Sequence, residues 1–149
     1  MTTTTPVPQT APTTSGLASP TTQLKIAAAA TIAFGLMIAF GAHARTDGLL
    51  RWFADLLFWP LGDPATLTDE AQLLAAILGG VMVSWAVLFW MLTNELATSN
   101  PKLLKRLIMT TMAVWFVIDS SASIASGGWL NVIGNVGFLA LFILPARRL

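Results

Sequence analysis

The 149-residue chain is far more apolar and less charged than a soluble domain. Hydrophobic residues make up 55% of it and charged residues 10%, and the mean hydropathy is +0.72. About 25% of the residues in a typical soluble domain are charged. The composition therefore excludes a soluble globular domain and predicts an all-α membrane protein. The net charge of +1 also excludes a basic surface for nucleic acid.

The chain contains no cysteine and one histidine. This excludes disulfides, thiolate chemistry and zinc sites that need several Cys or His ligands from one chain. We expect neither a metal nor a cofactor. Enzyme motifs such as a nucleophile elbow or a phosphate-binding glycine loop are also absent from the sequence, so we do not expect catalysis.

The start of the chain differs from the rest. Residues 1–22 include nine Thr, four Pro and no charged residue, a composition that buries too little apolar surface to offset the entropy cost of ordering. We predict a disordered tail at 1–22 and a single four-helix transmembrane domain at 23–149.

The first transmembrane helix is predicted at 24–44, because its apolar stretch approaches the ~20 residues needed to cross a bilayer. The segment ends in Ala42-His43-Ala44, which also has the small-x-small form of a signal cleavage site. Cleavage there would leave three spans, and this alternative stays open.

A short amphipathic helix is predicted at 49–59. Its apolar residues recur at helical spacing, on the face opposite Arg51 and Asp55. Eleven residues are too few to cross a bilayer, so we expect the helix to lie flat on the outward-facing surface of the membrane. The apolar residues are Leu49, Trp52, Phe53, Leu56 and Leu57.

Three further transmembrane helices are predicted at 70–94, 102–126 and 129–145. A polar loop at 95–100 precedes the second of these, and Gly127-Gly128 forms the turn before the last. Helix starts are marked by Thr68 and by Asn100-Pro101, which are favourable N-terminal capping residues. Pro145 is expected to end the last helix.

Small residues at intervals of four predict faces where helices approach closely. On the first span these are Thr31 and Gly35. The next span offers one smooth face made of several such pairs, which we expect to pack against a neighbouring helix. Its small residues are Ala75, Ala76, Gly79, Gly80 and Ser84.

Most Lys and Arg residues fall on one side of the predicted layout. Six lie on the side of the two termini and the 95–106 segment, and only Arg45 and Arg51 lie on the other. By the positive-inside rule, both termini are expected in the cytoplasm. Because barrel proteins dominate outer membranes, we expect this helical chain in an inner (cell) membrane. The six are Lys25, Lys102, Lys105, Arg106, Arg147 and Arg148.

One acidic residue, Asp119, lies inside a predicted span, where a carboxylate costs ~2.5–3.5 kcal/mol unless it faces protein or water. Ser123 follows one turn later on the same face. Asn131 and Asn135 are one turn apart on the next span. Counting outward from the turn brings Asn135 level with Asp119 and Asn131 level with Ser123, so we predict a polar cluster of these four residues.

Two interpretations of this cluster stay open. The first is a structural pin, in which hydrogen bonds hold the last two helices together. The second is a site for a proton, a cation or a small polar ligand, because intramembrane carboxylates commonly mark functional sites.

Part of the sequence resembles a known group of proteins. The resemblance is to the C-terminal half of small bacterial four-helix membrane proteins of unassigned function, and it covers residues 70–145 at most. It implies a bacterial origin and a four-helix layout, and it implies no activity. The residues that carry it are Trp115 to Ser123, Ser126-Gly127, Asn131, Asn135 and Phe138.

Two functions are consistent with these features. With a smooth small-residue face and little chain outside the bilayer, the protein is first expected to be a non-catalytic accessory or structural subunit of a membrane complex, or a small homo-oligomer. The alternative is a small proton- or cation-coupled transporter or channel that uses Asp119. The lipid bilayer is a partner in both cases, and nucleic acid is a partner in neither.

Overall fold

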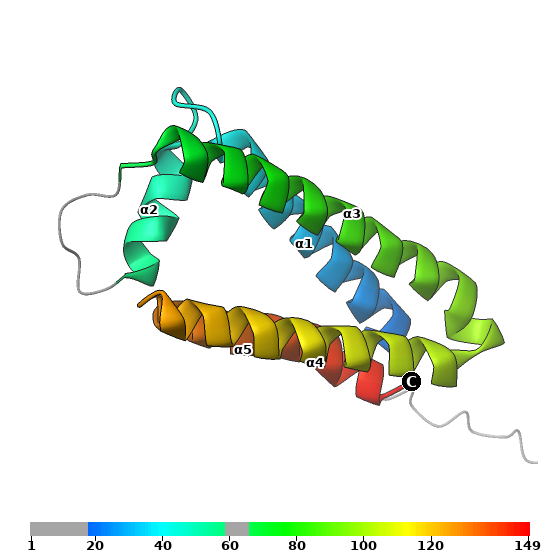
Figure 1. The fold of residues 1–149 in the computed structure, drawn as a ribbon. Coiled ribbons are helices and arrows are strands. Elements are labelled where there is room, and N and C mark those ends of the chain that lie inside the picture. Colours follow the sequence, from blue (N-terminus) through cyan, green and yellow to red (C-terminus); the bar gives the residue numbers. More distant parts are fainter. Residues whose placement is uncertain (1–17, 59–65) are drawn as a thin grey trace, which may run out of the picture.

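A computed structural model describes residues 18–58 and 66–149 of the chain. This part of the chain is helical, without strands, and four of its helices are long and apolar enough to cross a membrane. The predicted all-α fold with four candidate spans is therefore confirmed. The helices are α1 (Pro20–Gly41), α2 (Gly48–Leu57), α3 (Asp69–Ser99), α4 (Pro101–Ala125) and α5 (Leu130–Arg147) (Figure 1).

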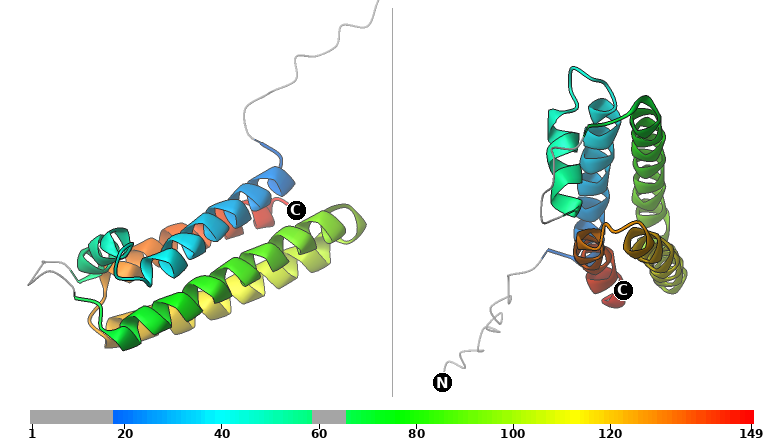
Figure 2. Two further views of the ribbon diagram at one scale, coloured as in Figure 1. Left: turned by 90° about the horizontal axis from the view of Figure 1, so that it is seen from above. Right: turned by 60° about the vertical axis from the view of Figure 1, so that its left-hand side comes forward.

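The four long helices form two pairs, α1/α3 and α4/α5. The pairs lie close together at one end, called here the narrow end, and diverge toward the other, the wide end (Figure 1). The narrow end contains the connection between α3 and α4 and the C-terminus. The short helix α2 lies at the wide end, beside α1 (Figure 2). The six Lys and Arg residues predicted on the cytoplasmic side lie in or directly next to the helix ends that meet at the narrow end.

Helices α1 and α3 cross in backbone contact through two glycines. A Cβ atom on Gly79 would lie 2.5 Å from the Ala39 nitrogen and 2.6 Å from the Gly35 oxygen. Gly35 and Gly79 are thus small residues that allow close approach, as predicted. A Cβ atom on Gly80 would instead meet nothing within 4 Å, and Ala76, Gly80 and Ser84 of the predicted smooth face are exposed among the described residues.

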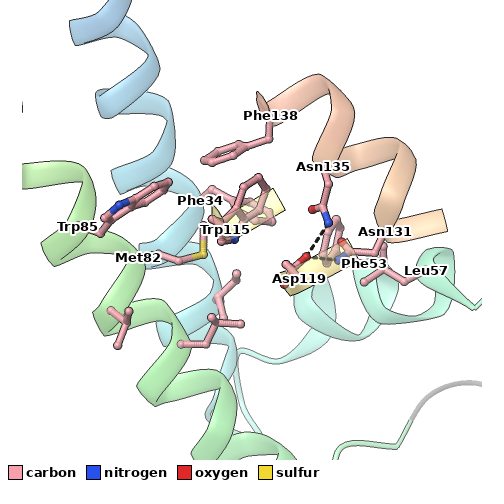
Figure 3. A pocket seen from close by; sticks show the side chains of 13 residues that line it. Phe34, Phe53, Leu57, Met82, Trp85, Trp115, Asp119, Asn131, Asn135 and Phe138 are labelled. Carbon is pink, nitrogen blue, oxygen red and sulfur yellow. Dashed lines mark hydrogen bonds between the residues drawn. The ribbon is translucent and has the colours of Figure 1, made fainter. Parts of the chain in front are cut away.

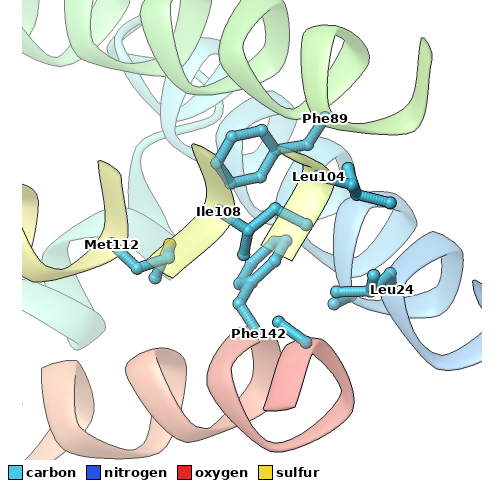
Figure 4. Packing of buried hydrophobic residues seen from close by; sticks show 8 residues of the cluster. Leu24, Phe89, Leu104, Ile108, Met112 and Phe142 are labelled. Atoms are coloured by element: carbon cyan, nitrogen blue, oxygen red, sulfur yellow. The ribbon is translucent and has the colours of Figure 1, made fainter. Parts of the chain in front are cut away.

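A hydrophobic cluster joins the two helix pairs at the narrow end (Figure 4). All eight of its residues are at most 3% exposed, and they come from all four long helices. Burial of this kind stabilises a bundle in detergent or lipid mainly through close packing. The cluster consists of Leu24, Ala27, Phe89, Leu104, Ile108, Met112, Phe142 and Ala146.

Helix α1 begins earlier than predicted. The Ser19 side chain accepts a hydrogen bond from the Thr22 backbone N–H at 3.2 Å, and Pro20 occupies the first turn. The same capping pattern begins α4, as predicted, where the Asn100 side chain accepts from the Leu103 N–H at 3.0 Å. The prediction of disorder was therefore wrong for residues 20–22. Residues 1–17 of the predicted tail lie outside the described residues.

Three other predicted helix ends were wrong. Helix α1 ends at Gly41, three residues before the predicted end at 44. Helix α3 continues through the predicted loop at 95–100 as far as Ser99, because Leu96 and Ala97 pack against the narrow-end cluster. Pro145 lies inside α5, which continues to Arg147. A proline in the last turn removes only one backbone hydrogen bond, and Pro145 is buried there.

Helix α2 has two apolar stripes instead of one. Leu50 packs directly on Gly41, where an added Cβ atom would lie 2.7 Å from the Leu50 Cβ. One turn later the Phe53 ring meets the Phe34 ring edge-on, with 5.3 Å between centroids. The second stripe is exposed and consists of Leu49, Trp52 and Leu56. The predicted helix at 49–59 ends at Leu57, and Trp59 lies outside the described residues.

Candidate functional site

Four polar side chains meet between α4 and α5, and Figure 3 shows three of them, Asp119, Asn131 and Asn135. The Asn131 amide nitrogen donates to Asp119 Oδ2 at 2.9 Å and to Ser123 Oγ at 2.8 Å. The Asn135 amide nitrogen donates to the same Asp119 oxygen at 2.6 Å. The structure thus brings together all four residues of the predicted polar cluster, at the predicted levels along the two helices.

The turn between the two helices sets this register. Gly127 has a φ of +84°, a left-handed conformation that glycine adopts without steric cost. Helix α4 ends at Ala125 and α5 begins at Leu130, so the chain reverses within one short turn. Side chains four residues apart on each helix then face the partner helix at matching heights.

Ser120 is a further member of the cluster that the sequence did not single out. Its Oγ accepts the second N–H of the Asn135 amide at 3.1 Å, and the residue is 7% exposed. Each asparagine amide therefore donates one hydrogen bond to Asp119 and one to a serine. Ser126, one turn from the cluster, bonds the Ser123 carbonyl oxygen instead, at 3.0 Å.

The polar cluster forms one wall of a cavity of about 380 Å³ toward the wide end. All five helices contribute to its lining, and α2 supplies Phe53 and Leu57 (Figure 3). Among the described residues that line it, Asp119 is the only charged one. The remaining walls are apolar, so the carboxylate and the two asparagine amides are the polar part of an otherwise apolar chamber.

Aromatic rings separate this cavity from the narrow end. The Trp85 ring lies 4.8 Å from Phe89, 6.1 Å from Phe138 and 6.0 Å from Phe142 between centroids. Trp115 meets Phe138 edge-on at 5.2 Å. The sequence did not assign these rings to the site. Their spacing could have indicated this, because Trp115 precedes Asp119 by one turn and Phe138 follows Asn135 by three residues, on the same helix faces.

A second cavity of about 310 Å³ shares several of these walls, including Phe34, Asn131 and Asn135. It reaches Ala30 on α1 and Gly134 on α5, which are both exposed. These two residues lie within candidate spans. The second cavity thus reaches the side of the bundle, between α1 and α5.

The described residues contain no group of three or more His, Asp or Glu side chains that could hold a metal ion. The lone histidine, His43, is exposed in the connection after α1, where its Nδ1 accepts the Arg45 backbone N–H at 3.1 Å.

Neither a protein-family model nor a curated protein nor a solved structure matches this chain. The class of protein follows from the helices themselves. Four apolar helices of spanning length, in one helical chain, define a multi-pass membrane protein.

Proposed function

We propose that this protein is a small cation transporter of the membrane, in which Asp119 is the cation-binding carboxylate. The observation that supports this most is the exposure of Asp119 to a cavity inside the helix bundle. Asp119 lies thirteen residues beyond Arg106, or about 20 Å along the helix, and hence deep in the bilayer. A carboxylate at such a depth is costly, and its retention beside a cavity favours a functional role.

The closed narrow end favours a transporter over an open channel. The narrow-end cluster is almost completely buried, and Trp85, Trp115 and Phe138 pack between it and the cavity. A cation at Asp119 therefore has access from the wide end or the side of the bundle alone. Release on the opposite side requires the two helix pairs to separate at the narrow end, which is a conformational change of the kind that transporters make.

Charge movement in proteoliposomes tests this function. Purified protein is adsorbed on a solid-supported membrane and exposed to concentration jumps of H⁺, Na⁺, K⁺ or tetramethylammonium. At least one cation is expected to give currents in the wild type, and Asp119→Asn is expected to reduce them to those of empty liposomes. Ser126→Ala, which changes a polar residue outside the cluster, is expected to retain them. Equal currents from wild type and Asp119→Asn would refute the proposal.

A second candidate function is that of a non-catalytic accessory or structural subunit of a membrane complex. The open surface around Gly80 on α3 supports it, because small residues facing outward allow another helix to approach closely. Purifying the protein for the current measurement also distinguishes a subunit from a transporter. Mild-detergent extraction through a C-terminal tag yields a stoichiometric larger complex for a subunit, and the chain alone or with copies of itself for a transporter.

We further propose that the protein resides in the bacterial inner membrane with both termini in the cytoplasm. The clustering of six Lys and Arg residues at the narrow end supports this orientation, through the positive-inside rule. A reporter fused after Leu149 is then expected to give a cytoplasmic signal. A periplasmic signal would reverse the orientation and would place the cavity on the cytoplasmic side.

A further inference from the structure

We propose that the cavity at Asp119 binds an organic monocation with an aromatic or aliphatic body, such as a quaternary benzyl- or alkylammonium ion. The charged head lies at the Asp119 carboxylate and the body lies against the aromatic walls. This inference rests on the proposed function, in which Asp119 is the cation-binding group, and it adds the class of ligand.

The single negative charge in the cavity is matched by a ligand with one positive charge. Asp119 is its single charged side chain among the described lining residues. All Lys, Arg and His residues of the chain belong to the described part, and none of them lines the cavity. Arg51, on α2 at the wide end, is instead paired with Asp47 at 3.1 Å. A bound monocation would neutralise the carboxylate without further charges.

The polar cluster is poorly suited to a bare metal ion. Hard cations such as Mg²⁺ and Ca²⁺ take about six to eight oxygen ligands. Here one oxygen of Asp119 already accepts two amide N–H groups, and the hydroxyl oxygens of Ser120 and Ser123 accept one each. A quaternary ammonium ion needs no such ligand shell, because its charge is spread over carbon atoms that tolerate apolar contact.

The walls suit the rest of such a ligand. Phe34, Phe53, Trp115 and Phe138 all line both cavities, and aromatic faces attract ammonium ions through their ring electrons. A volume of about 380 Å³ falls within the range of about 300–1,000 Å³ that is usual for small-molecule sites. Met82 adds a flexible apolar contact on the α3 side (Figure 3).

The side of the bundle offers an entry route. The second cavity extends from the same rings to Ala30 and Gly134, which are exposed within the candidate spans α1 and α5. A Cβ atom on Gly134 would meet nothing within 4 Å. A cation with an apolar body binds to the bilayer with that body in the hydrocarbon and its charge at the interface, and it can reach the site from there, whereas a hydrated inorganic ion does not enter hydrocarbon.

The probe for this inference is benzyltrimethylammonium, titrated calorimetrically into the full-length protein in detergent. One molecule is expected to bind per chain, and Asp119→Asn is expected to weaken binding by about tenfold or more, because a charge-assisted contact is lost. Phe53→Leu is expected to weaken it by about threefold to thirtyfold through loss of one ring face. Trp52→Leu, on the exposed stripe of the same helix, is expected to leave it unchanged.

Probes of different charge and shape keep the test independent of variant folding. Phenylmethanesulfonate has the same ring with a tetrahedral head of opposite charge, and tetramethylammonium lacks the ring. The wild type is expected to bind the first not at all and the second more weakly than benzyltrimethylammonium. Three results would overturn the ligand class. The first is binding of phenylmethanesulfonate as strong as that of benzyltrimethylammonium, the second is full displacement of benzyltrimethylammonium by Na⁺, and the third is absence of benzyltrimethylammonium binding.

The two proposals fail in different ways. Currents that depend on Asp119 with H⁺ or Na⁺, together with no benzyltrimethylammonium binding, would overturn the ligand class and leave the transporter proposal standing. Binding of the organic cation with equal affinity to wild type and Asp119→Asn would overturn the role of Asp119 in recognition.

Discussion

Gly79→Ala is expected to lower the free energy of unfolding by about 3 kcal/mol, at the upper end of overpacking effects. The new methyl group would lie 2.5 Å from the Ala39 nitrogen and 2.6 Å from the Gly35 oxygen. Both are backbone atoms, which cannot move aside by changing a rotamer. Relief therefore requires α1 and α3 to separate along their length, with loss of contacts far from the substitution.

Two other glycines provide graded controls. Gly35→Ala meets atoms at 3.0 Å and is expected to have an intermediate effect. Gly80→Ala meets nothing within 4 Å, so it is expected to leave stability unchanged or raise it by up to about 1 kcal/mol through helix propensity. Unfolding in mixed micelles by added SDS, followed by circular dichroism, ranks the three. Equal effects at Gly79 and Gly80 would contradict the close crossing of α1 and α3.

The pair Asp119 and Asn135 is expected to show a coupling energy of about 0.6–1.7 kcal/mol, the range measured for hydrogen bonds between membrane helices. Each single Leu variant removes the 2.6 Å bond between the two side chains, and the double variant completes a thermodynamic cycle. The cycle is needed because Asp119→Leu also removes an unfavourable carboxylate from the bilayer. That contribution occurs with and without Asn135, so it cancels in the coupling energy.

The control cycle pairs Asp119 with Ser126, whose hydroxyl bonds the backbone of Ser123. Its coupling energy is expected to be near zero. The same unfolding assay serves both cycles. A coupling between Asp119 and Asn135 no larger than that of the control would contradict the hydrogen-bonded cluster and would remove the structural-pin interpretation as well.

The helices and the polar register could be predicted from sequence because both depend on local rules. Spanning length, capping residues such as Thr68 and Asn100, and the glycine turn at Gly127 each act within a few residues. Once the turn is known, a rise of ~1.5 Å per residue fixes which residues of α4 and α5 are level. Asp119 and Asn135 were therefore placed together without any long-range information.

Features that depend on distant contacts could not be predicted in this way. Helix α3 extends to Ser99 because Leu96 packs on residues from other helices, and nothing near Leu96 in the sequence signals this. Gly79 and Gly80 are equivalent in sequence, yet one lies at the α1 crossing and the other faces outward. The aromatic walls of the cavity come from all five helices, so no single segment reveals them.

The order of Asp119 and its hydrogen-bond partners along the chain has a consequence for biosynthesis. Its amide partners on α5 follow it in the chain by 12 and 16 residues. When α4 leaves the translocon alone, its carboxylate has no amide to satisfy it and carries the full insertion cost of ~2.5–3.5 kcal/mol. Entry of α4 together with α5 avoids this cost, so the helical hairpin, rather than the single helix, is the favourable unit of membrane insertion.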